Sequence, residues 1–320
     1  MNFLSKKNII ILLIITNVGT LSWYATRPSS EESFRNEYPY INPARNFISQ
    51  SDFIVNLQPL RTTLRALSGD FESKGGKVSI YLEFLNTGGN ISINQDAYIF
   101  PASLTKLPIA LVVMKKIEEG DWELTNELVL APQDKNAESG DEENPLAEYP
   151  VGTRFTIERL LEELLVNSDN TAALVFTRNL HDDELKEIVD EIGLEDLFTQ
   201  EGRYSAKEYS RLFRALYTSS FLTRANSQYI LELLDRAVFN EFLTASVPEH
   251  IRFPHKYGVG AHVMGTNFYA DSGIVYVPER PYLITVMVEG EKTADFEKRT
   301  ITFMHEVSSA AYEYFSSYGK

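Results

Sequence analysis

The spacing of hydrophobic positions predicts a helix and then a β-hairpin ahead of a second helix. Residues 53–71 place apolar side chains three or four positions apart, which is the period of an amphipathic helix. Residues 77–85 and 90–100 instead alternate apolar with polar positions on either side of an Asn-Thr-Gly-Gly-Asn turn, as the strands of a hairpin do. Helical spacing returns at about Ser103 and continues to Gly120, a residue type that often ends a helix.

The remainder of the chain combines a helical block with three strands and a closing helix. Helical spacing of apolar residues recurs in 156–166, 171–180, 182–193, 205–219 and 223–237. Strand-like patterns follow in 253–263, 266–277 and 282–290, before helical spacing over 295–318. Strands from both ends of a chain can share one sheet when the block between them forms its own lobe. We therefore predict an α+β fold with a mainly antiparallel sheet built from both chain ends, flanked by N- and C-terminal helices, and an inserted all-helical lobe over about 104–240.

An apolar run over about 8–25 follows two lysines near the N-terminus and ends with Trp23 and Tyr24. Such a run is typical of an exported or membrane-anchoring segment, and the aromatic pair suits a membrane interface. Trp23 stands where cleavage after Ala25 requires a small residue, so an uncleaved anchor is favoured over a removed signal. We expect an extracytoplasmic protein tethered to the cell membrane by residues 8–25, or a secreted protein if that segment is cleaved.

Composition divides the chain into three parts. Residues 1–26 form the anchor or signal segment. Residues 27–50 are polar, contain prolines and lack a sustained period, which is typical of a linker. Residues 51–320 carry the periodic segments and are expected to form the folded domain, which we expect to be monomeric.

Charge and cysteine usage exclude several kinds of chemistry. The formal net charge of −15 disfavours nucleic-acid binding, because phosphate backbones demand a cationic surface. The chain has no cysteine, and none of its 5 histidines stands in metal-binding spacing, so disulfides and thiolate sites are excluded and a metal is not expected. No cofactor is predicted. The chemistry must come from oxygen and amine groups that act on a small molecule or a neutral polymer.

A hydroxyl and an amine stand close together where the second helix is predicted to begin. Ser103 and Lys106 are three residues apart, so both lie on one helical face, and a lysine amine can take the proton that makes a serine nucleophilic. A helix that starts at the serine also brings backbone amides and the positive dipole end to the reacting centre. Taken alone, however, the pair is better explained by a serine that caps a helix.

Two further polar groups follow along the chain. Ser168, Asp169 and Asn170 interrupt two apolar helices, where a hydroxyl and an amide can both face a cleft. Lys256 stands on a predicted strand with glycines close behind it, as expected where a ligand backbone comes near. Each group has a simpler explanation, a polar turn in the first case and an edge-strand lysine in the second. The specific signal is the ordered set of three.

In this order the groups resemble the motifs of the penicillin-recognising serine hydrolases, and most closely those of the class A β-lactamases. That family carries S-x-x-K, S-D-N and K-[ST]-G, which correspond here to Ser103-Leu104-Thr105-Lys106, Ser168-Asp169-Asn170 and Lys256-Tyr257-Gly258. The resemblance covers about 51–320. It implies the fold shared by β-lactamases and transpeptidases.

The resemblance also implies a catalytic set. Ser103 would attack the carbonyl of a β-lactam or a D-alanyl peptide and hold it as an acyl-enzyme, while Lys106 would help to remove its proton. Ser168 would pass a proton to the leaving nitrogen, with Lys256 tuning that step.

A substrate-binding set follows from the same resemblance. Lys256 would attract the substrate carboxylate, and Asn170 would hydrogen-bond the amide side chain of the substrate. Tyr257 and Gly258 complete the third motif. The backbone amides of Ser103 and Val259 would form the oxyanion hole.

Two features depart from the family pattern. The E-x-x-L-N motif, whose glutamate activates the water that frees the acyl group, is absent, and only Glu195, Asp196 and Glu201 stand in the corresponding loop. These acids are more simply explained as solvated loop residues. Tyr257 occupies the position of a serine or threonine, either as a functional phenol or as a side chain turned away from the cleft by a local shift of the strand.

Three functional hypotheses remain from the sequence. The first is a serine hydrolase of the class A β-lactamase type that opens the β-lactam amide bond through Ser103. The second is a D,D-peptidase-like penicillin-binding protein that acts on peptidoglycan stem peptides and deacylates slowly. The third is a non-catalytic binding domain, which a retained set of polar motif residues disfavours because a scaffold has no packing reason to keep them.

Overall fold

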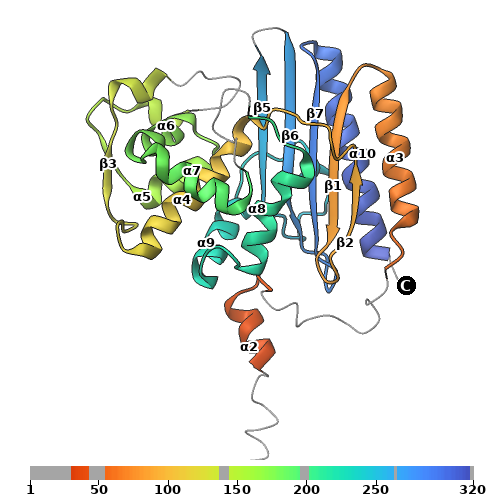
Figure 1. Cartoon of the computed structure of the whole chain (residues 1–320), viewed down its shortest axis with the longest axis horizontal. Helices are drawn as coiled ribbons and strands as arrows, with labels where there is room; N and C mark the ends of the chain where they lie inside the picture. Colours follow the sequence, from red (N-terminus) through yellow and green to blue (C-terminus); the bar gives the residue numbers. More distant parts are fainter. Residues whose placement is uncertain (1–29, 43–54, 137–143, 195–201, 263–264, 318–320) are drawn as a thin grey trace, which may run out of the picture. The chain divides into compact units, whose positions relative to one another are not determined.

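The computed structural model describes residues 30–42, 55–136, 144–194, 202–262 and 265–317, in two compact units that comprise residues 1–39 and 40–320 (Figure 1). The described part of the first unit holds one helix, α2 (Ser30–Glu37). The anchor predicted over 8–25 lies outside the described residues. Within the described ranges, no helix combines the length and the apolar character needed to span a bilayer.

A five-stranded antiparallel sheet forms the framework of the second unit, with the strand order β2-β1-β7-β6-β5. Its strands are β1 (Lys77–Phe84), β2 (Gly89–Ile93), β5 (His255–His262), β6 (Thr266–Val275) and β7 (Tyr282–Glu291). The hairpin from the first part of the chain therefore pairs with β7 from the last part, as the pattern of the sequence predicts. The α+β fold with a sheet built from both chain ends is confirmed. Strand β5 lies at the edge.

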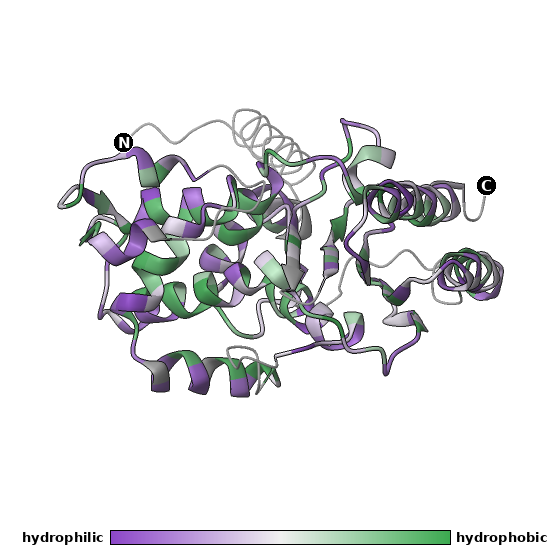
Figure 2. Ribbon diagram, turned by 90° about the horizontal axis from the view of Figure 1, so that it is seen from above, coloured by the Kyte–Doolittle hydropathy of each residue, from purple (hydrophilic) through white to green (hydrophobic). Residues whose placement is uncertain are grey.

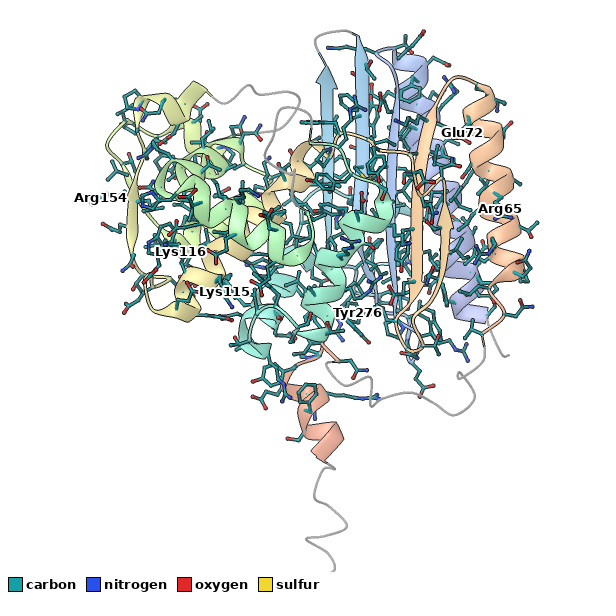
Figure 3. All side chains as sticks on the ribbon, in the orientation of Figure 1. Arg65, Glu72, Lys115, Lys116, Arg154 and Tyr276 are labelled. Carbon is teal, nitrogen blue, oxygen red and sulfur yellow. The ribbon has the colours of Figure 1, made fainter. Side chains whose placement is uncertain are left out.

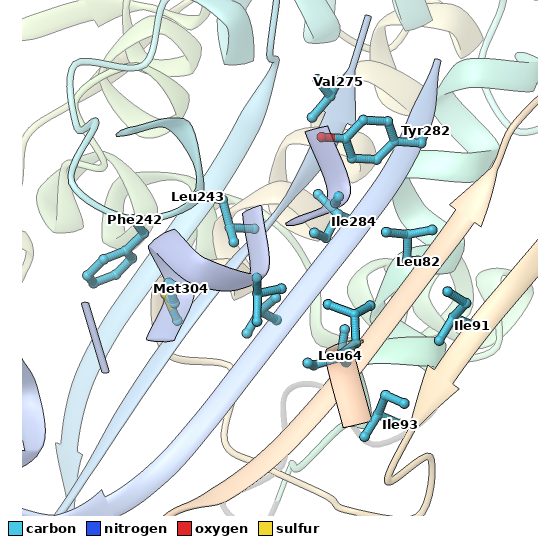
Figure 4. Close-up of a cluster of buried hydrophobic side chains, with 14 of the residues drawn as sticks. Leu64, Leu82, Ile91, Ile93, Phe242, Leu243, Val275, Tyr282, Ile284 and Met304 are labelled. Atoms are coloured by element: carbon cyan, nitrogen blue, oxygen red, sulfur yellow. The ribbon is translucent and has the colours of Figure 1, made fainter. Parts of the chain in front are cut away.

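Two helices cover one face of this sheet, α3 (Gln58–Ser73) and α10 (Ala294–Ser317) (Figure 1). Between them and the strands lies the main core, which contains Leu64, Ile284 and Met304 (Figure 4). Aromatic rings join the two helices, since the ring centroids of Phe71 and Phe303 are 4.6 Å apart. The apolar faces of α3, the strands and α10, which the sequence periodicity predicts, are thus buried in one shared core.

The helical lobe lies between β2 and β5 in the sequence. It comprises α4 (Lys106–Glu119), α5 (Ile157–Leu165), α6 (Asn170–Asn179), α7 (Asp182–Ile192), α8 (Ala206–Thr218) and α9 (Arg224–Asp235), with the 3-10 turns η2 (Ala102–Thr105), η3 (Pro132–Asn136) and η4 (Pro145–Glu148). Figure 2 shows hydrophobic and hydrophilic positions alternating around these helices, as amphipathic packing requires. A short ribbon of β3 (Glu127–Val129) and β4 (Arg154–Thr156), which the sequence pattern did not predict, also belongs to the lobe.

The first lobe helix begins later than predicted. We expected it to start at Ser103, but Ser103 lies in the 3-10 turn η2 and α4 starts at Lys106. Pro108 explains the difference, because its ring conflicts with an α-helical carbonyl four residues earlier and its nitrogen has no hydrogen to donate. The carbonyl in question, that of Leu104, instead accepts a 2.8 Å hydrogen bond from the buried Tyr209 hydroxyl. A residue 105 positions away therefore completes the start of this helix.

The second unit includes part of the predicted linker, Tyr40 to Asn42. Tyr40 and the two residues after it are buried, and the Tyr40 hydroxyl donates a 2.7 Å hydrogen bond to Asp235. The backbone nitrogen of Asn42 donates to the Tyr217 carbonyl at 2.8 Å. Burial and the neighbouring Asp235 carboxylate raise the pKa of Tyr40 to about 12. Tyr276, labelled in Figure 3, packs edge-on against the Tyr40 ring, so these residues belong to the folded unit.

Candidate active site

Ser103 and Lys106 meet at the junction of η2 and α4. The Lys106 Nζ lies 3.0 Å from the Ser103 Oγ, within hydrogen-bond distance. Both side chains are buried, with exposed fractions of 9% for Ser103 and 3% for Lys106. The i,i+3 spacing predicted to join the two groups therefore does so, although by way of a 3-10 turn and not an α-helical one.

Ser168 brings a second lysine into the same group. Its Oγ lies 3.0 Å from the Lys106 Nζ and 2.7 Å from the Lys256 Nζ. The Lys106 amine also donates to the Ser168 carbonyl, and the Lys256 amine donates to the Tyr257 carbonyl at 3.0 Å. Two buried lysines thus flank one buried hydroxyl. Such an array can move a proton between Ser103 and a group bound beside Ser168.

Two residues of the candidate site, Ala102 and Ser168, adopt an unusual backbone conformation. Ser168 has φ of 57° and Ala102, the residue before Ser103, has φ of 50°. Residues other than glycine seldom adopt this left-handed region, and such conformations persist where surrounding contacts fix them. In both cases the conformation directs a serine into the same buried cluster.

Asp169 fixes the Ser168 loop from within. Its carboxylate caps α6 by accepting the Ala172 N–H at 2.7 Å, and its second oxygen accepts the Leu146 N–H at 3.0 Å. Burial raises the pKa of Asp169 above its ordinary value, although the two backbone donors oppose that effect. Asp169 therefore acts as a structural support that joins the Ser168 loop to η4.

Asn144 provides a further support that the sequence interpretation did not identify. Its Oδ1 accepts the backbone N–H of Asn170 at 2.7 Å, at the first residue of α6. Asn144 and Leu146 belong to an acidic stretch of the sequence, 135–152, whose second half thus contacts the Ser168 loop. The Asn-Pro step at Asn144, a common turn initiator, was the available signal. The Asn170 side chain itself is partly buried.

Strand β5 approaches the candidate nucleophile closely at Gly258. A Cβ atom at this position would lie 2.7 Å from the Pro101 carbonyl oxygen and 3.0 Å from the Ser103 backbone nitrogen. Only glycine permits this approach, which brings the β5 backbone at Gly258 and Val259 alongside the Ser103 amide. The Val259 side chain is partly buried against the main core. Two backbone amides near one another are what an oxyanion hole requires.

The Tyr257 ring packs beside the Lys256 amine. The ring is 7% exposed and stacks on Phe239 with centroids 3.9 Å apart and planes 16° from parallel. The Lys256 Nζ lies 4.3 Å from the centroid of the Tyr257 ring, a cation–π distance. Lys256 therefore meets the π surface of residue 257. The ring belongs to the main core, and β5 pairs with β6 without interruption on both sides of Tyr257.

A buried His255–Asp271 pair precedes Lys256 and was not identified from the sequence. The His255 Nδ1 lies 2.8 Å from an Asp271 oxygen, and its Nε2 donates to the Phe239 carbonyl at 3.1 Å. The other Asp271 oxygen accepts the Leu243 N–H at 3.1 Å. The pair joins β5 and β6 to the loop that carries Phe239. No local sequence pattern predicts this pair, because His255 and Asp271 are 16 positions apart and come together only when β5 pairs with β6.

The loop acids Glu195, Asp196 and Glu201 lie outside the described residues. Within the described ranges, no group of three or more His, Cys, Asp or Glu side chains is arranged to hold a metal ion.

Comparison with solved structures places this geometry in a known fold. Over 81% of this chain, the structure of PBP-A matches with 22% identity and a TM-score of 0.70, covering 96% of that protein. A β-lactamase from Sphaerobacter thermophilus matches over 81% of this chain and 97% of its own, with 20% identity and a TM-score of 0.69. These similarities establish the β-lactamase and transpeptidase-like fold.

Sequence comparison identifies the family. The β-lactamase VEB-1 of Pseudomonas aeruginosa is 28% identical over 116 residues, which are 36% of this chain and only 38% of that protein. The sequence model described as the β-lactamase enzyme family matches residues 59–315, and therefore includes Ser103, Ser168 and Lys256. By this match over most of its length, the chain belongs to the β-lactamase enzyme family.

Proposed function

We propose that the protein is a serine hydrolase that opens β-lactam rings through an acyl-enzyme on Ser103. The observation that carries the proposal is the continuous array from Ser103 through Lys106 and Ser168 to Lys256, with contacts of 3.0, 3.0 and 2.7 Å. Membership of the β-lactamase enzyme family supports the same chemistry. A solved acyl-enzyme complex of a PBP-A variant with penicillin G shares the fold, with a TM-score of 0.68 over 80% of this chain.

Acylation follows from these positions. Lys106, as a neutral amine, takes the proton of the Ser103 hydroxyl while the serine oxygen attacks the carbonyl carbon of the lactam. The electron pair of the carbonyl moves to its oxygen, which the backbone amides of Ser103 and Val259 stabilise. When the carbon–nitrogen bond breaks, Ser168 gives its proton to the nitrogen and regains one from Lys106. The product is an ester on Ser103 with an opened ring.

Lys256 supports the proton transfer from Ser168. Its amine lies 2.7 Å from the Ser168 Oγ, so its positive charge favours a negatively charged oxygen there while the proton leaves. Asn170, at the start of α6, is proposed to bind the amide of the acyl side chain. Hydrolysis then adds water to the ester, which releases a carboxylate and restores the Ser103 hydroxyl.

A second candidate is a D,D-peptidase-like penicillin-binding protein with slow deacylation. The observation that favours it is the absence of an E-x-x-L-N sequence, whose glutamate activates water in class A enzymes. Both candidates share the acylation step and differ in the lifetime of the ester. The substrate would then be a D-alanyl stem peptide and not a β-lactam.

Intact-mass measurement over time separates the two candidates. The full chain is mixed with a penicillin, and the adduct and the hydrolysed drug are followed together. An adduct that forms and then disappears while hydrolysed drug accumulates supports the β-lactamase. A persistent adduct supports the peptidase-like protein, and the lack of both an adduct and hydrolysed drug contradicts both candidates. The full chain is needed because Tyr40 and Asn42 pack into the folded unit.

We also propose that residues 8–25 tether this enzyme outside the cytoplasm, where β-lactams and stem peptides are found. The support is the apolar run after two lysines, with aromatic residues at its end. Fractionation of cells that express the full chain tests this proposal. Recovery in the membrane fraction, with the folded unit accessible to external protease, is expected, and a cytoplasmic location contradicts it.

A further inference from the structure

A buried glutamate of α5 lies next to the loop that carries Ser168. Helix α5 ends at Leu165 and α6 begins at Asn170, so residues 166–169 connect two neighbouring helices of the lobe (Figure 1). The Glu163 side chain is fully buried, although glutamate is rarely found in the interior of a protein unless it is paired. The reaction proposed above does not use this carboxylate.

Glu163 contacts the residues on both sides of Ser168. Its Oε2 accepts a 2.6 Å hydrogen bond from the side-chain amide of Asn167, and its backbone carbonyl accepts the Asp169 N–H at 2.9 Å. The first contact depends on the carboxylate, whereas the second is made by the backbone alone. Glu163 therefore fixes the loop immediately before and immediately after Ser168.

An ion pair with Arg159 holds the Glu163 carboxylate in place. Arg159 precedes Glu163 by four residues and contacts its Oε1, while Asn167 follows by four residues and donates to its Oε2. Residues four apart lie on the same face of a helix, so the three side chains form a row that continues beyond the end of α5. Hydrogen bonds to an ionised carboxylate are stronger than those between neutral groups. The Asn167 amide is thus bound by a strong acceptor in a fixed position.

The loop requires such support because of the backbone conformation of Ser168. Its φ of 57° lies in the left-handed region, which persists in residues other than glycine only where neighbouring contacts enforce it. In this conformation the Ser168 Oγ lies 3.0 Å from the Lys106 Nζ and 2.7 Å from the Lys256 Nζ. A small rotation of the loop would lengthen both contacts, and proton transfer depends on such distances.

Stability alone does not explain a carboxylate at position 163. Burial is the main cause of the raised pKa of Asp169, and the negative charge of Glu163 acts in the same direction. Two buried acids that repel each other are unfavourable, and an apolar side chain in place of a buried charge is often neutral or stabilising. The contact of Glu163 with Asn167 gives the carboxylate a role that an apolar side chain could not take.

We propose that Glu163 is a positioning residue for the acylation of Ser103, which acts through Asn167 to hold the Ser168 hydroxyl between the two lysine amines. The inference rests on the proposed function, in which Ser168 gives its proton to the leaving nitrogen. It adds a residue of α5 whose effect on the reaction rate passes through Ser168.

Two substitutions remove the contact from either end. Glu163→Met fills a similar volume without an acceptor, and Asn167→Ala removes the donor from a partly buried side chain. Each is expected to slow the opening of a penicillin ring by about tenfold or more, because displacement of a reacting group by a fraction of an ångström is costly. The double variant should be no slower than the slower single variant, since both changes remove one contact.

The rate is measured by quench flow under single-turnover conditions, with the full chain in excess over the penicillin. The lifetime of the ester on Ser103 then does not affect the result. Asn167→Ala changes a partly buried side chain, so it remains informative if Glu163→Met fails to fold. Urea unfolding of each variant is measured alongside the rate.

A double-mutant cycle with Ser168→Ala separates positioning from a general structural role. If Glu163 acts through Ser168, Glu163→Met should not slow ring opening further in the Ser168→Ala background. A general disturbance of the fold would lower the rate in both backgrounds. Glu162→Met is the matched control, because Glu162 is the neighbouring glutamate of α5 and also pairs with Arg159. This control should keep the wild-type rate.

The outcomes distinguish the inference from the function on which it rests. An unchanged rate in a folded Glu163→Met or Asn167→Ala variant overturns the positioning role and leaves the proposed function intact. An equal loss in Glu162→Met, or a further loss in the Ser168→Ala background, has the same consequence. A wild-type chain that neither opens the penicillin ring nor forms an adduct overturns the proposed function and the inference together.

Discussion

The Lys256 Nζ lies 2.7 Å from the Ser168 Oγ, and the same oxygen lies 3.0 Å from the Lys106 Nζ. A hydroxyl that accepts from two amines directs its own hydrogen away from both of them. In the proposed reaction that hydrogen is the one transferred to the leaving nitrogen. The arrangement unites residues from α4, the loop before α6 and the edge strand β5, which explains why three distant motifs act together.

Lys106→Ala is expected to slow the acylation of Ser103 by about 10²-fold or more, because the substitution removes the base that takes the serine proton. Lys74→Ala, which removes a largely exposed lysine of a surface ion pair, is the matched control and should leave the rate unchanged. Stopped-flow or quench-flow acylation by a penicillin is the measurement. Equal rates in wild type and Lys106→Ala would place the base elsewhere.

Gly258→Ala is expected to reduce acylation by about 10²-fold, as for the loss of one oxyanion donor, because the new methyl group would push β5 away from Ser103. The added Cβ would approach the Pro101 carbonyl to 2.7 Å. Gly260→Ala is the matched control on the same strand, since its Cβ would lie 3.1 Å from the Ala102 methyl group and 4.0 Å from the next nearest atoms, with no backbone oxygen or nitrogen among them. Acylation rates of the two variants are compared. A larger loss in Gly260→Ala contradicts this assignment.

Tyr209→Phe is expected to lower the free energy of unfolding by about 1–3 kcal/mol, because the buried Leu104 carbonyl loses its donor. Burial raises the pKa of Tyr209 well above its ordinary value, so the hydroxyl keeps its hydrogen and remains a donor across the accessible pH range. Urea unfolding measures the change. Tyr229→Phe, which changes a partly buried tyrosine of the lobe, provides the comparison, and an equal loss there would contradict a specific role of Tyr209 at the start of α4.

Asp169→Asn is expected to destabilise the protein by about 1–3 kcal/mol at neutral pH, because an amide NH₂ would face a backbone donor now bound by a carboxylate oxygen. Burial raises the pKa of Asp169 in the folded state above its ordinary value of 3.8. The Asp169 carboxyl group therefore binds a proton more tightly in the folded state than in the unfolded state. The resulting contribution to the free energy of unfolding is greatest at low pH.

The pH dependence of unfolding tests the direction of the change in the Asp169 pKa. As the pH rises from below 3.8 through the raised folded-state pKa, the wild type loses the stabilisation that comes from its protonated Asp169. The difference in unfolding free energy between wild type and Asp169→Asn should therefore narrow over that interval. Urea unfolding at a series of pH values measures it. A difference that widens with pH contradicts the raised pKa.

Sequence patterns predicted the sheet because four of its strands have eight or ten residues, which is long enough to be recognised. The first strand, predicted over 77–85, is β1 at Lys77–Phe84, and the last helix, predicted over 295–318, is α10 at Ala294–Ser317. Strands β3 and β4 were missed because each has three residues, too few to show a period. The predicted helix start at Ser103 was displaced by Pro108 and by a donor that lies 105 residues away.

The motif residues were found from the sequence because their order along the chain is specific. The residues that hold the motif residues in place were not predicted. Asn144 lies 26 residues from its partner Asn170, and Asp271 lies 16 residues from His255, so no local pattern connects either pair. The orientation of Tyr257 also depends on Phe239, which a strand pattern cannot reveal because the partner is in a separate loop. Side-chain contacts across elements thus required the structure.

Intact-mass analysis of the full chain and of Ser103→Ala, each incubated with a penicillin, shows directly whether Ser103 carries the acyl group. We expect a mass increase equal to that of the penicillin in the wild type, no increase in Ser103→Ala, and nearly equal thermal unfolding midpoints for the two proteins. Covalent labelling that survives in folded Ser103→Ala would contradict the assignment of Ser103 as the nucleophile.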